Sequence, residues 1–283
     1  DSHFHIGTMH LSNGLPCQDY ALAGELPEGA YAIVSDGCSS GGHTDLGSRV
    51  IAHATSSAII RAHTLARSFE PNARIAMEGR AQAVLDSTNE MLRLRPEDML
   101  ATCLYAYTKA GEGARIGIRG DGVIALRMSG ALFLLRFEWA DNRPFYPGYG
   151  DDGLQPFIDA HGGDLHAARF FEELWEINPG KKPELKATQQ HSLSQGIEGI
   201  TISLAREELD THDLIAIFSD GVTQVDGLDW KDAVQELLAF KTPEGNFAKR
   251  RMNAAIKHWQ KIGRGPLDDI AYAVIRIGES KEK

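Results

Sequence analysis

The chain has 283 residues, of which 42% are hydrophobic and 24% are charged, a globular composition that can bury a core. The formal net charge of -10 argues against nucleic acid as the main partner, because neutralising phosphates requires a basic surface. No apolar run reaches spanning length and no secretory segment is recognisable, so the sequence predicts a soluble cytoplasmic protein without a membrane partner.

Three cysteines occur in the sequence: Cys17, Cys38 and Cys103. Their number is odd and no C-x-x-C pair is present, which argues against a disulfide framework and against a structural zinc site. A reducing compartment fits this cysteine usage best.

The amino-terminal part of the chain begins with strand signals. Alternating or short apolar runs predict strands over residues 4–9, 20–24 and 30–34. The third run stops at Ser35-Asp36-Gly37, which reads as a turn.

Two long helices are predicted next. Apolar residues repeat every four positions over residues 46–58, which indicates a helix that Thr44 or Asp45 caps. A second helix is expected from residue 71 or 72 to about residue 94, where Pro96 ends it.

Strand signals return over residues 100–107, 114–118, 123–127 and 132–137, with Gly120-Asp121-Gly122 as one of the turns between them. Residues 141–190 are rich in proline, glycine, aspartate and aromatic residues. We interpret this segment as an insertion or flap rather than a core element, with one helical patch near residues 165–175. Its aromatic residues are interpreted as packing within the insertion.

The carboxyl-terminal part is predicted to hold strands over residues 200–204 and 214–218, helices over residues 230–239 and 247–262, and a last strand over residues 270–277. This order lacks the regular alternation of a parallel doubly wound sheet. It indicates an α+β fold of mainly antiparallel sheets with helices packed outside them, in a single domain over residues 1–283; two modest domains stay open on length alone.

A set of aspartates falls at the predicted strand ends. Asp36, Asp121 and Asp220 each follow a strand and stand beside glycine, Asp19 precedes a strand, and Asp268-Asp269 opens the last one. Carboxylates at strand ends can converge in a cleft between sheets, and an all-oxygen set suits Mg²⁺ or Mn²⁺. Each motif alone is explained as an ordinary turn, so the case depends on the ordered set.

This ordered set resembles the type 2C family of metal-dependent protein phosphatases. The motifs are Gln18-Asp19, Ser35-Asp36-Gly37, Gly120-Asp121, Ser219-Asp220-Gly221 and Asp268-Asp269-Ile270. Residues 14–42 resemble the bacterial branch, and the resemblance extends from residue 10 to residue 277 except over 141–190. It implies a four-layer αββα sandwich, two antiparallel sheets flanked by helices.

The resemblance also implies the roles of individual residues. Two divalent ions, Mn²⁺ or Mg²⁺, would be held by Asp19, Asp36, the Gly37 carbonyl, Asp220 and Asp268, with Asp36 bridging them and Asp121 as ligand of a weaker third ion. Asp268 is preferred over Asp269, which stands where the family usually has Asn. The expected catalytic residues are Asp36, Asp19 and His10. Two cations that share a water lower its pKa, and this water attacks phosphorus without a covalent enzyme intermediate.

The sequence departs from the family pattern at three places. Cys38 stands where many relatives have a His that protonates the leaving group. The usual phosphate-gripping Arg has no counterpart, and His10 is the candidate substitute, although a structural His is the plainer interpretation. An Asp that is usual after the Asp220 motif is replaced near Gln224.

Other chemistries fit the sequence less well. No H-E-x-x-H motif supports a catalytic zinc, and no Gly-Lys-Ser/Thr follows the glycines of residues 37–42, which excludes a nucleotide P-loop. Ser39 and Ser40 lack a G-x-S-x-G context for a nucleophile.

Two function classes therefore stay open. The first is a phosphoserine/phosphothreonine protein phosphatase whose partner is a phosphorylated protein, a regulatory protein such as one in sigma-factor control, or a partner kinase. The second is a catalytically weak or inactive regulatory module with the same fold. The complete acidic set favours the first, and Cys38 with the missing Arg favours the second.

Overall fold

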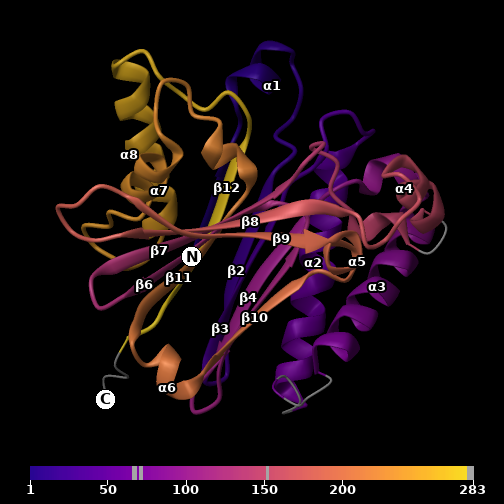
Figure 1. The fold of residues 1–283 in the computed structure, drawn as a ribbon, viewed down its shortest axis with the longest axis horizontal. Coiled ribbons are helices and arrows are strands. Elements are labelled where there is room, and N and C mark those ends of the chain that lie inside the picture. The colour runs from indigo at the N-terminus through magenta and orange to yellow at the C-terminus, as the bar shows by residue number, and fades with distance from the viewer. Residues whose placement is uncertain (66–68, 70–72, 151–152, 279–283) are drawn as a thin grey trace.

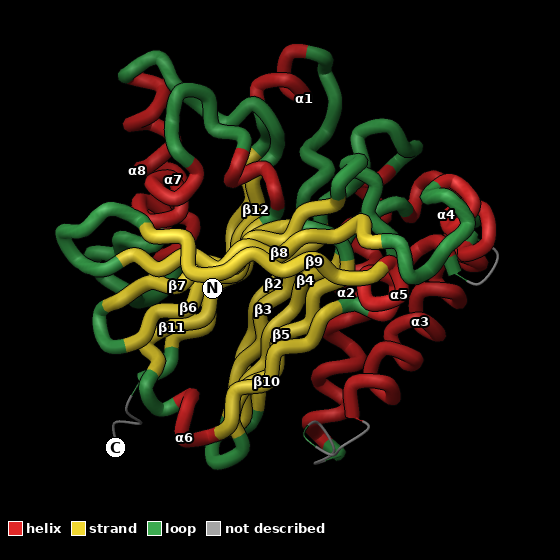
Figure 2. The backbone as a smooth tube through the Cα atoms, viewed as in Figure 1, coloured by secondary structure: helices red, strands yellow, loops and turns green. Residues whose placement is uncertain are grey.

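The structure, a computed structural model, describes residues 1–65, 69, 73–150 and 153–278. Two antiparallel sheets lie face to face, and pairs of helices cover their outer faces (Figures 1 and 2). The α+β fold and the four-layer αββα order predicted from the sequence are confirmed.

The first sheet has seven strands. Their spatial order is β1 (Ser2–His5), β12 (Ile270–Arg276), β11 (His212–Phe218), β6 (Gly122–Met128), β7 (Ala131–Trp139), β8 (Ala168–Ile177) and β9 (Glu184–Ser192). The second sheet has five strands, in the order β10 (Ile200–Ala205), β5 (Gly113–Arg119), β4 (Cys103–Lys109), β3 (Gly29–Ser35) and β2 (Tyr20–Leu26). Each pair of neighbours is antiparallel.

The long helices form the outer layers. Helices α2 (Thr44–Thr64) and α3 (Ala73–Leu92) cover the five-stranded sheet, and α7 (Trp230–Leu237) and α8 (Phe247–Lys261) cover the seven-stranded sheet (Figure 1). The remaining elements are short: α1 (Thr8–Ser12), α4 (Leu154–Ala160), α5 (Leu193–Glu198), α6 (Arg206–Leu209), and 3₁₀ turns η1 (Pro96–Met99), η2 (Pro147–Tyr149) and η3 (Asp220–Thr223).

The hydrophobic core has three parts, one for each interface between layers. Strand β11 shows why its sequence is a continuous apolar run. Ile215 and Ile217 face the other sheet, whereas Ala216 and Phe218 face the helices α7 and α8. Because both faces of this central strand are buried, alternation with polar residues disappears.

The structure corrects the first of the predicted strands. Residues 4–9 are not one strand: β1 ends at His5, and α1 begins at Thr8. The N–H groups of Thr8 and Met9 donate to the carbonyls of Pro266 and Leu267, each at 3.0 Å, so contacts far along the chain redirect the backbone here. The second long helix is described from Ala73; the predicted start at residues 71–72 lies outside the described residues.

The segment 141–190 differs most from its prediction. The helical patch at residues 165–175 is wrong, because this stretch forms most of β8, and β8 pairs with β7 along its length. Phe170 and Ile177 of β8 are 1% and 5% exposed, so the expectation that this segment holds no core element is also wrong. Pairing with β7 outweighs the helical spacing of the apolar residues.

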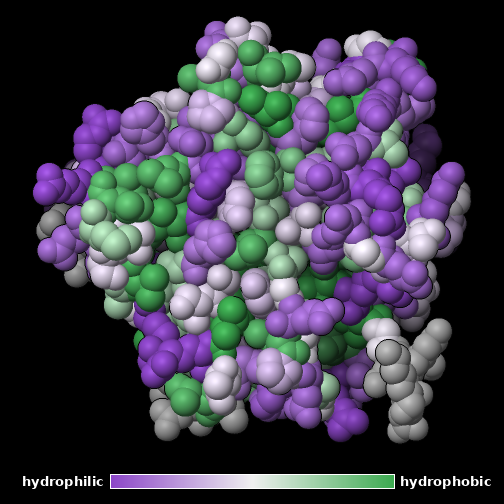
Figure 3. All heavy atoms as spheres, turned by 180° about the vertical axis from the view of Figure 1, so that it is seen from behind, coloured by the Kyte–Doolittle hydropathy of each residue, from purple (hydrophilic) through white to green (hydrophobic). Residues whose placement is uncertain are grey.

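The surface mixes hydrophilic side chains with separate apolar patches on the face opposite to that of Figure 1 (Figure 3). Within the described ranges, none of the helices has both the length and the apolar character required to cross a membrane.

Candidate metal centre

The register of the sheets brings the predicted aspartates to one end of the sandwich. Tyr20 pairs with Ser35 in β2 and β3, so Asp19 and Asp36, the next residues outward, are neighbours. Phe218 pairs with Tyr272 in β11 and β12, so the segments that carry Asp220 and Asp268 also meet. Because the two sheets face each other, both pairs of loops converge at this end.

Asp36 occupies the middle of the cluster. Its side chain lies within hydrogen-bonding reach of both Asp19 and Asp220. Loss of hydration raises the pKa of Asp36 well above its usual value, and the charges of Asp19 and Asp220 raise it further. Thr102 fixes the backbone, because its hydroxyl accepts the Asp36 N–H at 3.0 Å and its N–H donates to the Asp36 carbonyl at 2.8 Å.

Asp19 is the most deeply buried member. It is 1% exposed, and its Oδ2 has no hydrogen-bond partner in the described part of the chain. Burial raises the pKa of Asp19 well above its usual value, although contacts with Asp36 and Ser219 oppose the shift. A buried carboxylate oxygen without a partner is costly unless a cation completes its environment.

Asp220 is linked to Asp268 through Gln224. Nε2 of Gln224 donates to Asp220 Oδ2 at 3.1 Å and to Asp268 Oδ2 at 3.5 Å. Loss of hydration raises the pKa of Asp220, and the charge of Asp268 contributes in the same direction. Gln224, near which the family usually has an Asp, thus holds two members of the cluster with a neutral amide.

Asp121 lies at the side of the cluster, in the turn between β5 and β6. The flanking Gly120 and Gly122 have φ angles of 109° and 142°, which side chains rarely adopt. A Cβ on Gly122 would lie 2.5 Å from the Phe218 carbonyl oxygen, so the turn packs directly on the end of β11. Burial raises the pKa of Asp121 well above its usual value, and the charge of Asp220 raises it further.

Gly37 follows Asp36 where the backbone is tightly enclosed. A Cβ at this position would lie 2.8 Å from the Thr44 carbonyl oxygen and 2.9 Å from that of Gln18. Only glycine fits here without displacing the backbone of the neighbouring loops. The Gly37 carbonyl therefore comes from a segment whose position is fixed on both sides.

Asp268 and Asp269 have different surroundings. Both oxygens of Asp269 accept backbone hydrogen bonds, from Gly7 N–H at 2.7 Å and from Gln18 N–H at 2.6 Å. Asp269 is 2% exposed, whereas the side chain of Asp268 is 28% exposed. Asp268 is thus the member of the pair with capacity left for a cation.

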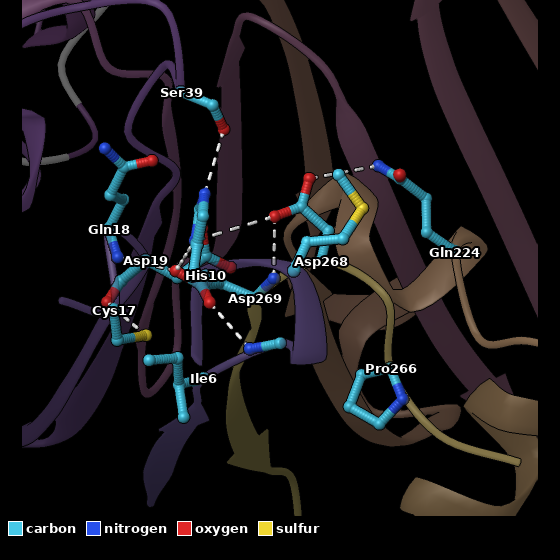
Figure 4. Close-up of polar contacts among 12 residues, drawn as sticks. Ile6, His10, Cys17, Gln18, Asp19, Ser39, Gln224, Pro266, Asp268 and Asp269 are labelled. Carbon is cyan, nitrogen blue, oxygen red and sulfur yellow. Dashed lines mark hydrogen bonds and ion pairs between the residues drawn. The ribbon is translucent and has the colours of Figure 1, made fainter. Parts of the chain in front are cut away.

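His10 lies beside this pair on α1 (Figure 4). Its Nδ1 is 2.9 Å from Asp269 Oδ2 and 4.0 Å from Asp268 Oδ1, and its Nε2 is 3.2 Å from Ser39 Oγ. His10 is 4% exposed, so it is an internal side chain that reaches toward the acidic cluster.

The structure adds a neighbour that sequence reasoning missed. Tyr146, interpreted from the sequence as packing, is buried against Cys38. Burial raises the pKa of the Tyr146 hydroxyl, and the Cys38 thiol and the charges of Asp121 and Asp36 raise it further. Cys38 Sγ also lies 3.1 Å from Ser40 Oγ. The side chain of His43, in the same loop, is exposed.

The loop after Asp36 is held by Asp98 of η1. Its Oδ1 accepts the His43 N–H at 2.7 Å and its Oδ2 accepts the Arg95 N–H at 2.9 Å. Although burial opposes the shift, these hydrogen bonds and the Arg95 guanidinium lower the pKa of Asp98 to about 2. The start of α2 is therefore capped by a distant carboxylate, and the predicted caps Thr44 and Asp45 do not cap it.

These residues fit divalent cations. Burial raises the pKa of Asp19, Asp36 and Asp220, and in the described ranges no lysine or arginine forms an ion pair with them or with Asp268. Carboxylate oxygens whose charge is not balanced by a lysine or arginine are ligands of the kind that Mg²⁺ and Mn²⁺ prefer.

Comparisons with known proteins agree with this arrangement. A sequence model described as protein phosphatase 2C matches residues 6–145. No protein with a curated function matches the sequence. Family members depend generally on divalent metals.

Solved structures resemble the whole chain. A bacterial serine phosphatase is 12% identical, with 99% of each chain covered and a TM-score of 0.57. The serine/threonine phosphatase Stp1 from Staphylococcus aureus is 11% identical, with 98% of this chain and 95% of that chain covered and a TM-score of 0.55. The S. agalactiae serine/threonine phosphatase is 16% identical, with 98% and 100% covered and a TM-score of 0.55.

At these identities the solved structures establish the fold, and the sequence model supplies the family for the half of the chain that carries Asp19 and Asp36. The resemblance seen in the ordered aspartate motifs is confirmed: the chain belongs to the protein phosphatase 2C family.

Proposed function

We propose that this chain is a metal-dependent phosphoserine/phosphothreonine protein phosphatase that uses two divalent ions, Mn²⁺ or Mg²⁺. The observation that carries the proposal is the convergence of Asp19, Asp36 and Asp220 into one cluster in which burial raises the pKa of all three carboxyl groups, and in which the charges of Asp19 and Asp220 raise that of Asp36 further. Such a cluster is stable in its charged form only with cations bound.

Each residue has a proposed role in holding the ions. Asp36, within reach of two other carboxylates, would hold both ions, and the Gly37 carbonyl would support one of them. Asp19, Asp220 and Asp268 complete the set. Asp121, at the side of the cluster, is assigned to a weaker third ion.

When bound, the two ions supply charge neutralisation for the phosphoryl oxygens and lower the pKa of a water toward about 7. The chain's own part is to hold the carboxylates at fixed strand ends and to keep His10 on the phosphate side. Asp36 and Asp19 are the proposed catalytic residues, with His10 in a supporting position beside Asp268 and Asp269.

The proposed partner is a phosphorylated protein, with a regulatory protein or a partner kinase as the expected class. A groove of about 900 Å³ opens between α3 and the segment that follows β7, with Ile75, Arg119 and Tyr149 among its walls. Burial and the nearby Cys38 thiol raise the pKa of the Tyr149 hydroxyl, so this wall of the groove lies near the loop that follows Asp36. A peptide chain around the phosphorylated residue would have room there.

A second candidate function is a regulatory module of the same fold with little turnover. The observation that favours it is Cys38, which is half-buried against Tyr146 in place of a proton-donating His. The two candidates differ in one measurable property, the release of phosphate in the presence of Mn²⁺.

The test compares Asp36→Asn with a matched control on the same part of the fold. We expect wild-type protein to hydrolyse an aryl phosphate with Mn²⁺ or Mg²⁺, to lose activity on chelation and to regain less with Zn²⁺. Asp36→Asn should abolish activity and weaken Mn²⁺ binding, because a neutral amide cannot balance two dications.

Asp213→Asn is the control, since Asp213 is exposed at the opposite end of β11 from Asp220. It removes the same charge and should retain wild-type activity. If Asp36→Asn kept activity within a few-fold of wild type, the assignment of a two-metal site would be rejected.

A further inference from the structure

His10 connects the interior of the molecule with an exposed hydroxyl beside the acidic cluster. Figure 4 shows its ring between Ser39 on one side and the Asp268–Asp269 pair on the other. The contacts are Asp269 Oδ2 to Nδ1 at 2.9 Å and Nε2 to Ser39 Oγ at 3.2 Å. Asp269 directly precedes β12, His10 belongs to α1, and Ser39 lies in the loop after β3.

Asp269, at the buried end of these contacts, is fixed by hydrogen bonds to the backbone. Asp269 is held by the N–H groups of Gly7 and Gln18, and both residues flank segments of the site: Gly7 precedes α1, and Gln18 precedes Asp19. Nδ1 of His10 is buried and makes no hydrogen bond with the described residues, although Asp269 Oδ2 lies 2.9 Å from it.

The outer end is open to solvent. Ser39 is exposed, and its hydroxyl makes no hydrogen bond with the described residues other than the one to His10. Ser39 stands three positions after Asp36, so it lies on the rim of the proposed metal centre. Its neighbour Ser40 is also exposed, but its hydroxyl meets Cys38 instead.

A metal ion between His10, Asp268 and Asp269 is the alternative explanation, because one donor atom of each lies within 4.8 Å of the others. The two backbone hydrogen bonds to Asp269 argue against it. Each oxygen of Asp269 already accepts a backbone N–H, which makes Asp269 a poorer ligand for a cation than Asp268, whose side chain is 28% exposed.

We propose that Ser39 contacts the phosphoryl group of the substrate and that His10 and Asp269 are positioning residues that orient its hydroxyl. This inference rests on the proposed function. A phosphoryl oxygen can only accept hydrogen bonds, so Ser39 donates its hydrogen to it, while Nε2 of His10, 3.2 Å from the Ser39 oxygen, keeps that oxygen in place. Asp269 faces the other ring nitrogen and thereby fixes which edge of the ring meets Ser39.

The experiment measures binding of inorganic phosphate to the Mn²⁺-loaded protein by calorimetry, together with kcat and KM for an aryl phosphate. Ser39→Ala should weaken phosphate binding roughly tenfold or more, as expected when a hydrogen bond to a charged group is lost. It should raise KM more than it lowers kcat and leave Mn²⁺ content unchanged. Ser40→Ala, the matched control, should behave as wild type in all three measurements.

A double-mutant cycle tests the positioning roles. Asp269→Asn should weaken phosphate binding in the wild-type background and have little further effect in Ser39→Ala, because it acts through that hydroxyl. His10→Gln gives the same cycle if Asp269→Asn does not fold. Equal losses in both backgrounds, or unchanged phosphate binding in Ser39→Ala, would overturn the inference. Absence of Mn²⁺-dependent turnover in wild type would instead reject the proposed function, while phosphate binding still decides the role of Ser39.

Discussion

At the scale of single residues, what distinguishes this site is the set of side chains next to the ligands. Cys38 follows the Asp36-Gly37 turn and is half-buried beside Ser40 and Tyr146. If a positioned acid is missing here, its absence matters for a poor leaving group and little for an aryl phosphate, whose phenolate leaves without help.

Cys38→His should therefore raise turnover of phosphoserine peptides and leave aryl phosphate hydrolysis nearly unchanged. A positioned acid contributes about 10²–10⁴-fold in favourable cases, and a newly introduced one should recover a part of this. Steady-state rates on both substrates provide the measurement. Equal changes on both, or no change on either, would show that Cys38 does not mark the place of a missing acid.

The convergence of the aspartates in the candidate site could be predicted in large part from local sequence. Asp36 and Asp220 each follow a continuous apolar strand and precede glycine, which the sequence displays directly. The contacts from Asp269 through His10 to Ser39 could not be predicted, because they join distant parts of the chain. His10 is 29 positions from Ser39 and 259 positions from Asp269. Tyr146 was missed for the same reason, since its contact with Cys38 spans 108 positions.

At the scale of elements, the site depends on how loops are tied to the sheets. Asp98 in η1 accepts N–H groups from His43 at the start of α2 and from Arg95, and so holds the loop that leads away from Asp36. This explains how α2 begins at a definite residue without a side-chain cap of its own.

Asp98→Ala should lower the free energy of unfolding by roughly 1–3 kcal/mol, because it leaves two partly buried N–H groups without acceptors. The control is Glu97→Ala, which removes an exposed ion pair with Arg95 and should cost less than about 1 kcal/mol. Urea denaturation measures both. Because the folded pKa of Asp98 is lowered to about 2, its contribution is present above the usual value of 3.8 and is lost as the pH falls toward 2.

Elements were predicted well where burial alone decides them and poorly where pairing decides them. The long helix α2 and the strands β3, β11 and β12 follow from their apolar patterns. Strand β8 was predicted as helix because its apolar residues are spaced for one, and only its partner β7 determines the outcome. The break between β1 and α1 likewise depends on residues 266–267.

At the scale of the whole molecule, the two sheets place several carboxylates where they repel one another. Burial and neighbouring charges raise the pKa of Asp19 and Asp36 in the folded chain, so folding without metal favours their protonated forms. A group with a raised folded pKa stabilises the fold below its unfolded value of 3.8, and this contribution is lost as the pH rises through the folded pKa.

Metal-free protein should therefore lose thermal stability as the pH rises above the unfolded value of 3.8, whereas Mn²⁺ should stabilise it increasingly over the same rise. At a concentration of 100 Kd, a single ion adds about 2.7 kcal/mol, which corresponds to a rise in Tm of several degrees. Calorimetric scans with Mn²⁺ or with chelator make the comparison. A Tm that does not respond to Mn²⁺ at the higher pH would be inconsistent with this electrostatic account.

The central claim is that the carboxylates at this end of the sandwich hold two divalent ions. The most direct measurement is anomalous diffraction from crystals of the protein grown with Mn²⁺. The account predicts two manganese peaks bridged by Asp36, with Asp19 on one side and Asp220 and Asp268 on the other. No peak within this cluster, or a single peak between His10 and the Asp268–Asp269 pair, would contradict it.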